Sequence, residues 1–219
     1  MPRRAHHASS GRALPWILVG LLMVAGAGAG AWALLRDGGP GEEEALPVPD
    51  LVWEVARVRA TAVDAEAPQG DLETAGDAVT DLLDRLYTTA FVDPGEWDEG
   101  RFPGLGSYFA GPATARAERD RDDLTLGGGA AGIQRVVPTR ARLRLSFLVD
   151  PQGAPYAAVA TATFRADGRT SDGGALAIAH HGRYVVRQVE GEWLIVGYDV
   201  EGSVESVADP GPGTPGATP

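Results

Sequence analysis

The spacing of apolar side chains changes along this chain, and each spacing predicts a different kind of structure. Residues 13–35 (ALPWILVGLLMVAGAGAGAWALL) contain no charged side chain. From Asp71 to Phe91, apolar residues recur every three or four positions, which is typical of an amphipathic helix. From Val136 onward they alternate with polar residues, which is typical of strands with one buried face. This order predicts an N-terminal transmembrane helix, then further helices, then an antiparallel sheet.

The apolar stretch 13–35 is long enough to cross a bilayer. As a helix rising ~1.5 Å per residue it would reach about 34 Å, against a hydrocarbon core of ~30 Å. Trp16 and Trp32 lie near its ends, where indole rings favour the membrane interface. Three Arg precede the stretch, and four acidic residues follow it within 37–44. We therefore expect a single-pass plasma-membrane protein, anchored in the lipid bilayer, with a cytoplasmic N-terminus and an extracytoplasmic domain.

Cleavage of the same stretch as a signal peptide is the alternative. Ala27-Gly28-Ala29 and Ala31-Trp32-Ala33 both fit a small-x-small cleavage pattern, but the stretch is longer than the apolar region of a signal peptide. Gly26 and Gly30 form a GxxxG spacing that could pack two membrane helices together. Codon bias is the alternative explanation of these glycines, because 30 Gly and the use of Arg for every basic residue indicate a GC-rich genome.

Beyond the apolar stretch, the pattern divides the chain into a spacer, a domain and a tail. Residues 37–50 are rich in Gly, Pro and acids and predict a flexible spacer, to which 51–63 could add a short helix. The helix from Asp71 ends at Asp93-Pro94-Gly95, and 113–121 predict a second, shorter helix. The expected organisation is a cytoplasmic leader (1–12), a transmembrane helix (13–35), an acidic stalk (36–70), a folded domain (71–205) and a disordered tail (206–219).

The second half of the domain predicts four or five antiparallel strands. In the first strand, apolar residues at 143, 145 and 147 alternate with a row of three cations, Arg140, Arg142 and Arg144. A turn follows at 150–153, and a tight hairpin link is expected at 190–192. The other strands are expected at 156–165, 175–181, 183–189 and 193–200. Helices followed by such a sheet make the expected fold class α+β.

Composition narrows the classes of function. The chain has no Cys, which excludes disulfides and thiolate chemistry. Residues 37–219 carry 15 Arg against all 30 acidic residues, which leaves a formal charge of −15. A domain this acidic is repelled by phosphate backbones, so we expect no nucleic-acid partner. We also expect no cofactor, because the Gly-rich stretch 127–132 has neither a dinucleotide-binding nor a phosphate-loop spacing.

The closing strands carry a family resemblance. The segment GRYVVRQVEGEWLIVGYDV (182–200), with Gly191, Trp193 and Ile195 in its hairpin, resembles the last hairpin of the nuclear transport factor 2-like superfamily. The resemblance covers about residues 71–205 and implies a cone-shaped domain of helices packed on a curved antiparallel sheet. With a single N-terminal anchor, the chain is similar to two groups within that superfamily. These are the actinobacterial membrane proteins associated with mammalian-cell-entry lipid importers and the bitopic assembly subunits of secretion and conjugation machines.

The resemblance also directs attention to the interior of the cone, where enzymes of the superfamily such as ketosteroid isomerase and scytalone dehydratase place Asp, Tyr or His. His180 and His181 are adjacent on a strand, so only one of them can point inward. An inward histidine could act as a general base or could be structural. Six residues either line an apolar ligand pocket or fill the core: Tyr87, Trp97, Tyr108, His180, Tyr184 and Trp193.

Charged residues give one distinctive surface feature. The row Arg140, Arg142 and Arg144 lies on an otherwise acidic domain, so it either docks an acidic partner or protects an edge strand from sheet addition. The pair Asp81 and Asp84 is typical of a solvated helix face, and the acids at 120–123 are a charge run without a calcium-loop order. We therefore expect neither a metal site nor a catalytic constellation.

The favoured hypothesis is a non-catalytic, membrane-tethered scaffold that binds a protein partner, or a second copy of itself, in the cell envelope. The alternatives are a protein that binds a small apolar ligand, an isomerase-like or dehydratase-like enzyme, and an assembly subunit of a secretion or conjugation machine. What lines the interior of the sheet separates these hypotheses, because a catalytic pocket requires titratable groups within hydrogen-bond reach of one another.

Overall fold

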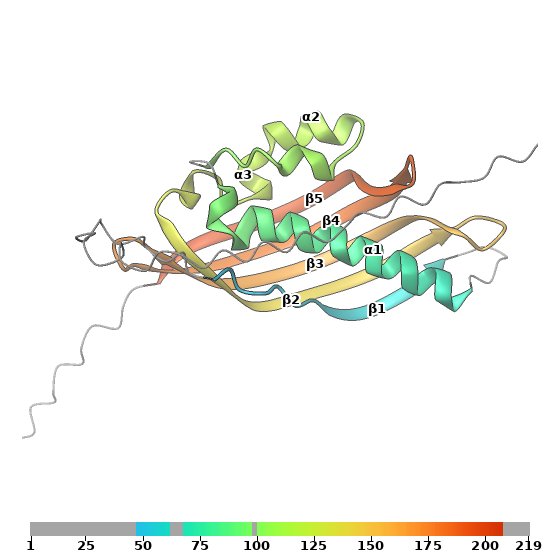
Figure 1. Ribbon diagram of the computed structural model, residues 1–219, viewed down its shortest axis with the longest axis horizontal. Helices are drawn as coiled ribbons and strands as arrows, with labels where there is room; N and C mark the ends of the chain where they lie inside the picture. The colour runs from blue at the N-terminus through green and yellow to red at the C-terminus, as the bar shows by residue number, and fades with distance from the viewer. Residues whose placement is uncertain (1–46, 62–67, 98–99, 208–219) are drawn as a thin grey trace, which may run out of the picture. The chain divides into compact units, whose positions relative to one another are not determined.

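Four long strands joined by short turns form an antiparallel meander, and a fifth strand is added at its edge (Figure 1). The meander consists of β2 (Ile133–Val149), β3 (Pro155–Thr170), β4 (Ala175–Val189) and β5 (Glu192–Val207). The edge strand β1 (Glu54–Thr61) pairs in parallel with β2, so the sheet order is β1-β2-β3-β4-β5. The computed structural model describes residues 47–61, 68–97 and 100–207, which belong to the unit Ala45–Pro219.

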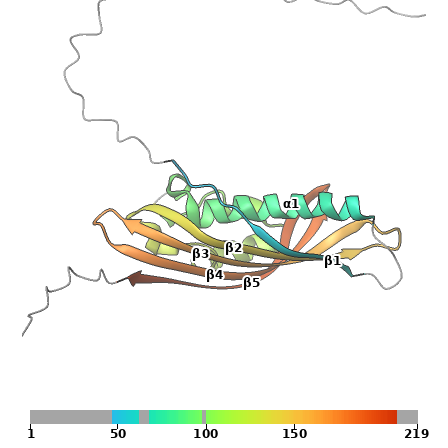
Figure 2. The same ribbon diagram turned by 90° about the horizontal axis from the view of Figure 1, so that it is seen from below.

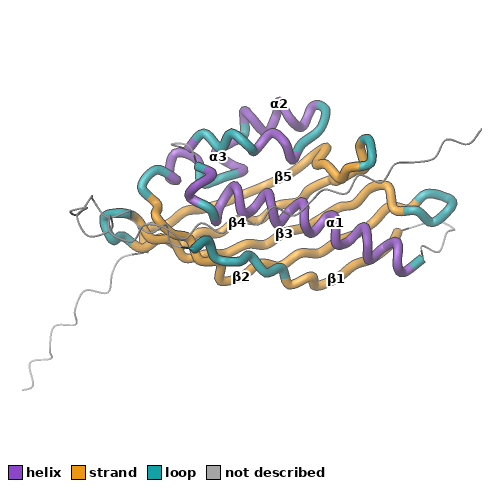
Figure 3. The backbone as a smooth tube through the Cα atoms, in the orientation of Figure 1, coloured by secondary structure: helices purple, strands orange, loops and turns teal. Residues whose placement is uncertain are grey.

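The helices connect β1 to β2. The longest, α1 (Gln69–Tyr87), continues into a π-helical turn, η1 (Thr88–Val92). It lies across one face of the sheet, as Figure 2 shows from below and Figure 3 shows by element type. Two shorter helices pack near β5, namely α2 (Pro112–Arg119) and α3 (Arg121–Leu124). The remaining turns are 3₁₀ helices: η2 (Pro94–Glu96), η4 (Leu105–Tyr108) and η5 (Gly127–Ala130).

The predicted α+β class is confirmed, but the sheet is mixed instead of purely antiparallel, because β1 runs parallel to β2. The short helix expected within 51–63 is wrong, since this segment supplies β1. Its valines and threonine favour a strand, and such a short segment shows too few turns for its periodicity to separate the two structures. The sheet of the domain therefore begins before residue 71, where the sequence placed a stalk.

The predicted membrane stretch 13–35, including Gly26 and Gly30, lies outside the described residues. Among the helices that the structure describes, none has the length and apolar character needed to span a membrane.

The core lies between α1 and the face of the sheet that α1 covers. Helix α1 buries one stripe of side chains, in which Val79, Leu83 and Leu86 are at most 1% exposed. The strands alternate, so that Leu143 and Leu145 of β2 point into the same core while their neighbours point to solvent. Burial of this apolar face is the main source of stability of the unit.

Strand β4 runs without interruption through Gly182, where the sequence predicted a break between 181 and 183. A Cβ built on Gly182 would lie 2.5 Å from a ring carbon of Tyr184, two residues further along the same face. The glycine therefore leaves the space in which the Tyr184 ring lies, and it is a packing position instead of a strand end.

We expect Gly182→Ala to lower the free energy of unfolding by about 2 kcal/mol, because the Tyr184 ring must move out of a close-packed core. Urea denaturation followed by circular dichroism measures this change. Gly197→Ala in β5 is the matched control, since its added Cβ would meet Val185 at an ordinary contact distance of 3.9 Å. Equal stability of the Gly182 variant and the wild type would contradict this account of the ring.

Candidate functional site

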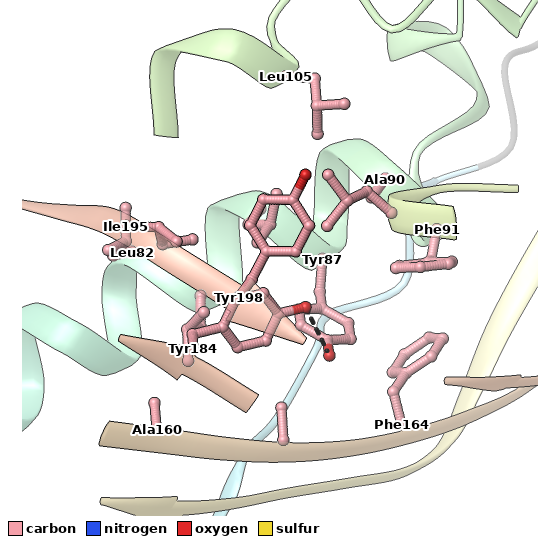
Figure 4. Packing of buried hydrophobic residues seen from close by; sticks show 14 of the residues in the cluster. Leu82, Tyr87, Ala90, Phe91, Leu105, Ala160, Phe164, Tyr184, Ile195 and Tyr198 are labelled. Atoms are coloured by element: carbon pink, nitrogen blue, oxygen red, sulfur yellow. Dashed lines mark hydrogen bonds between the residues drawn. The ribbon is translucent and has the colours of Figure 1, made fainter. Parts of the chain in front are cut away.

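The inner face of the sheet holds a buried chain of hydrogen bonds. Tyr87, at the end of α1, accepts a hydrogen bond from the Tyr184 hydroxyl at 3.2 Å and lies 2.9 Å from Nδ1 of His180. The other ring nitrogen of His180, Nε2, lies 3.3 Å from the backbone carbonyl oxygen of Asp123. Figure 4 shows the two tyrosine hydroxyls directed at each other among buried aromatic rings.

The donor and acceptor properties of these groups determine where each proton lies in this series of hydrogen bonds. A carbonyl oxygen only accepts, so Nε2 of His180 carries the proton and donates to Asp123. Nδ1 of the neutral ring then accepts from the Tyr87 hydroxyl, which in turn accepts from Tyr184. All three side chains are thereby satisfied in their neutral forms.

Burial holds these groups neutral over the physiological range. Desolvation lowers the pKa of His180 to about 4 and raises the pKa of both Tyr87 and Tyr184. Among the described residues, the hydrogen-bond partners of His180 are a tyrosine hydroxyl and a backbone carbonyl, and none is a carboxylate. Both nitrogens of this neutral histidine are therefore engaged within the core.

Aromatic rings fill the space around this network. The Tyr87 ring lies 5.0 Å from Trp53 and 5.5 Å from Phe164, measured between ring centroids. Phe91, in the π-helical turn, lies 4.7 Å from the His180 ring. Tyr87 and Tyr184 are at most 1% exposed, and neither lines any of the surface depressions described below. Packed side chains therefore occupy the inner face around this network.

A separate open groove lies between α1, η4 and the β4–β5 hairpin, with a volume of about 650 Å³. It is lined by Asp81 and Asp84 from α1 and by Tyr108 and Trp193 from the other elements. Partial burial raises the pKa of Asp84, and the nearby negative charges of Asp81 and Asp50 raise it further, while the Trp53 indole opposes the rise. The groove is open to solvent, and of its two acids Asp81 is exposed and Asp84 is half-buried.

The outer face of the sheet carries the Arg row. The pairing of β2 with β3 skips Thr139, and this bulge sets the phase that turns Arg140, Arg142 and Arg144 outward while Leu143 points to the core. The register places Arg140 opposite Arg165 of β3. It places Arg144 opposite Thr161 of β3, which in turn lies opposite Arg183 of β4.

We call this part of the outer face the basic groove and define it by Arg140, Arg142, Arg144, Thr161, Thr163 and His181, which line a depression, and by Arg165 and Arg183, which the register places beside them. Its centre is a hollow of about 330 Å³, with the short side chains of Thr161 and Thr163 between the longer ones of β2 and β4. His181 extends to 3.3 Å from the Thr163 hydroxyl. Arg142 forms a two-pronged ion pair with Glu54 of β1, at 2.6 and 3.3 Å.

Four of the five Arg in the basic groove lack such a partner. Within the described part of the chain, Arg140, Arg144, Arg165 and Arg183 form no ion pair, although all are exposed. Arg140 and Arg165 are directly opposed like charges, which destabilises a sheet. Five of the 15 Arg in residues 37–219 thus gather on one face of a domain with a formal charge of −15.

The six residues predicted to line a pocket separate into three groups. Tyr87, Tyr184 and His180 meet in the buried network, and His180 alone of these borders surface depressions, of about 350 and 180 Å³, the smaller of which Asp122 and Asp123 also line. Trp97 donates to the carbonyl of Thr89, and Tyr108 is hydrogen-bonded to the hydroxyl of the same threonine. Trp193 lines the open groove, as Tyr108 also does, and packs edge-on against Phe147. The six therefore do not enclose a common cavity.

Asp120, the first acid of the run at 120–123, has a structural role. Asp120 accepts hydrogen bonds from Arg116 and from the Tyr198 hydroxyl, and both lower its pKa. Arg116 stacks over the Tyr198 ring, so this cluster holds α2 against β5. Across the described residues, no group of three or more His, Cys, Asp and Glu is placed to hold a metal ion.

Sequence reasoning did not identify Thr161, Thr163, Arg165 and Arg183 as parts of a surface site. The alternation of apolar and polar residues along β3 and β4 indicates which face of the sheet these four residues occupy. Their position opposite the Arg row depends on the cross-strand register, which the hairpin turns set. No family model, curated protein or solved structure matches this chain.

We expect the stability of the domain to fall by about 2 kcal/mol between pH 7.5 and pH 5 on account of His180 alone. In the unfolded chain this histidine takes up a proton below a pKa of ~6.5, whereas the folded form resists protonation down to a pKa of about 4. The unfolded state therefore binds more protons in this window, so stability is lost as the pH falls and the loss is complete below about 4.

Urea denaturation at several pH values measures the slope, and His180→Gln should flatten it. His181→Gln is the matched control, because it leaves the buried ring in place and should keep the wild-type slope. A slope that survives in His180→Gln would assign the pH dependence to other groups.

Proposed function

We propose that this chain is a membrane-tethered, non-catalytic interaction module of a cell-envelope complex, which docks a partner on the outer face of its sheet. The observation that carries this proposal is the difference between the two faces. The inner face is packed with rings whose polar groups satisfy one another, and the outer face exposes Arg without ion-pair partners. Charged side chains that have no ion-pair partner within the fold are available to bind another molecule.

We further propose a nuclear transport factor 2-like fold and a kinship with the membrane proteins associated with mammalian-cell-entry importers. Support comes from the order of elements, with α1 before a four-stranded meander, and from the hairpin that precedes Trp193. Its two loop residues, Glu190 and Gly191, both have positive φ angles, of 53° and 90°, as the tightest hairpin turns require. Docking without catalysis is the role that this kinship implies.

A ligand-binding function is the competing proposal, and the open groove beside α1 favours it. The groove joins aromatic surface from Tyr108 and Trp193 to the acids Asp81 and Asp84, so it would accept an amphipathic molecule with a polar or cationic end. The tether and the basic groove play no part in that function, which makes the two proposals separable.

The tether makes a simple prediction. We expect the full-length chain to remain in the membrane pellet after an alkaline carbonate wash, because 13–35 would be embedded in the bilayer. Intact-mass measurement of the purified protein should give a chain that still contains this stretch. A chain that begins after Ala29 or Ala33 would instead show that the stretch is a cleaved signal peptide.

The docking face makes a second prediction. A groove variant with Arg140→Gln, Arg144→Gln and Arg183→Gln should dissociate from the membrane complex that the wild-type chain forms. Native electrophoresis of membranes solubilised in a mild detergent would show the smaller species. The variant leaves Arg142 and its ion pair with Glu54 intact, so β1 keeps its contact with the sheet.

The matched control variant carries Arg85→Gln, Arg119→Gln and Arg135→Gln, which removes three exposed cations outside the basic groove. It should keep the wild-type complex. Equal loss of the complex in both variants would assign the effect to net charge, and retention of the complex in the groove variant would contradict docking at this face.

A further inference from the structure

We infer that the basic groove binds an extended, carboxylate-rich protein segment, whose acidic side chains occupy alternate positions and adjoin apolar side chains at one end. This inference rests on the proposed function, because it names the chemistry of the partner that docks on the outer face. It follows from the spacing of the Arg row, the frame of charges around it and the apolar surface beside it.

The spacing of the cations matches an extended chain. Arg140, Arg142 and Arg144 are alternate residues of one strand, so their attachment points are about 7 Å apart. An extended segment that lies along the groove also presents every second side chain to it, at the same spacing. Each carboxylate can accept the paired N–H groups of one guanidinium, the strongest geometry for this pair.

The groove is narrow and its floor is polar. Arg144 and Arg183 flank Thr161 from the two neighbouring strands, so the walls stand about 10 Å apart at this level. The hydroxyls of Thr161 and Thr163 supply donors between the walls, and the hollow of about 330 Å³ gives room for side chains to enter. A single extended chain fits this width.

Acidic residues frame the groove and oppose a flat anionic surface. Glu54 of β1 lies on one side, Asp199 and Glu201 of β5 lie on the other, and Asp167 closes the end of β3 beyond Arg165. All four are exposed. A bilayer surface would meet these four carboxylates as well as the Arg, and the carboxylates would weaken its attraction to an anionic membrane. A narrow segment meets the cations alone, so the frame selects a chain over a membrane.

The fourth side of the groove carries apolar side chains. Continuing along the same face, the next level of the sheet presents Val159 and Val185 beside Ser146, and the level after it presents Leu148 and Arg187 on either side of the buried Ala157. Leu148 and Val185 are about 40% exposed, at 41% and 40%. Exposed apolar side chains that adjoin a charged groove are typical of a protein interface, and a free inorganic anion would leave them uncovered.

The test uses the full-length chain in zwitterionic detergent micelles and fluorescein-labelled nonapeptides, with binding followed by fluorescence anisotropy. Each of the two alternating peptides has glutamates at three alternate positions and valines at two further alternate positions, with serines between them. The valines follow the glutamates in one peptide and precede them in the other. The clustered peptide has the same composition with its three glutamates adjacent. A fourth peptide replaces every glutamate by glutamine.

We expect at least one alternating peptide to bind at least tenfold more tightly than the clustered and glutamine peptides. The groove variant should lose at least tenfold in affinity for it, and the matched control variant should bind as the wild type does. Because both variants remove three positive charges, a difference between them reports the groove itself. Raising the salt concentration should weaken binding in the wild type and the control variant.

Three results would overturn the inference. The first is equal binding of the clustered and alternating peptides, and the second is equal loss in both variants. The third is evidence that the groove binds a simple anion or a lipid headgroup. Displacement of the peptide by millimolar inorganic phosphate would show the first, and displacement by phosphatidylglycerol vesicles that bind through the same Arg would show the second. If the peptides fail to bind but the groove variant still loses its membrane complex, the inference is wrong and the proposed function stands. Peptide binding without any effect of the groove variant on the complex would refute the proposed function.

Discussion

Side chains along the four strands of the meander alternate between the two faces of the sheet, and this alternation positions both the core and the outer Arg. Phe164, His180 and Tyr184 point into the core, so their neighbours Arg165, His181 and Arg183 must point outward. A shift of the strand register by one residue would bury these charged side chains and expose the aromatic rings. The buried hydrogen bonds of His180 thus fix the position of the outer Arg as well as the core.

This coupling explains how an acidic domain keeps a basic groove that its own stability does not favour. Arg140 opposite Arg165 costs stability, and of the five Arg in the basic groove only Arg142 has an ion-pair partner among the described residues. The packed inner face supplies the stability that offsets this cost. A local conflict of this kind, on a face that the core does not need, is typical of a surface kept for a partner.

The sequence alone predicted the helix from Asp71, the alternating strands and their turns, because long periodic segments have one compatible structure. It predicted that only one of His180 and His181 points inward, and the structure confirms this with His180. It could not predict β1, whose eight residues are too few to separate a strand from a helix, nor the continuity of β4 through Gly182. The basic groove could be predicted only in part. The Arg row lies in one strand, but Thr161 and Arg183 are placed beside it only by the cross-strand register.

We propose that the outer face of the sheet, and not its interior or the groove beside α1, meets the partner. Site-specific photocrosslinking in native membranes distinguishes these surfaces, with a photoreactive residue placed at Thr161 in the basic groove, at Ala78 in the groove beside α1, or at Ala115 on α2. We expect a discrete crosslinked product from Thr161 and none from Ala78 or Ala115. Crosslinking from Ala78, with none from Thr161, would show that the partner docks at the groove beside α1 instead.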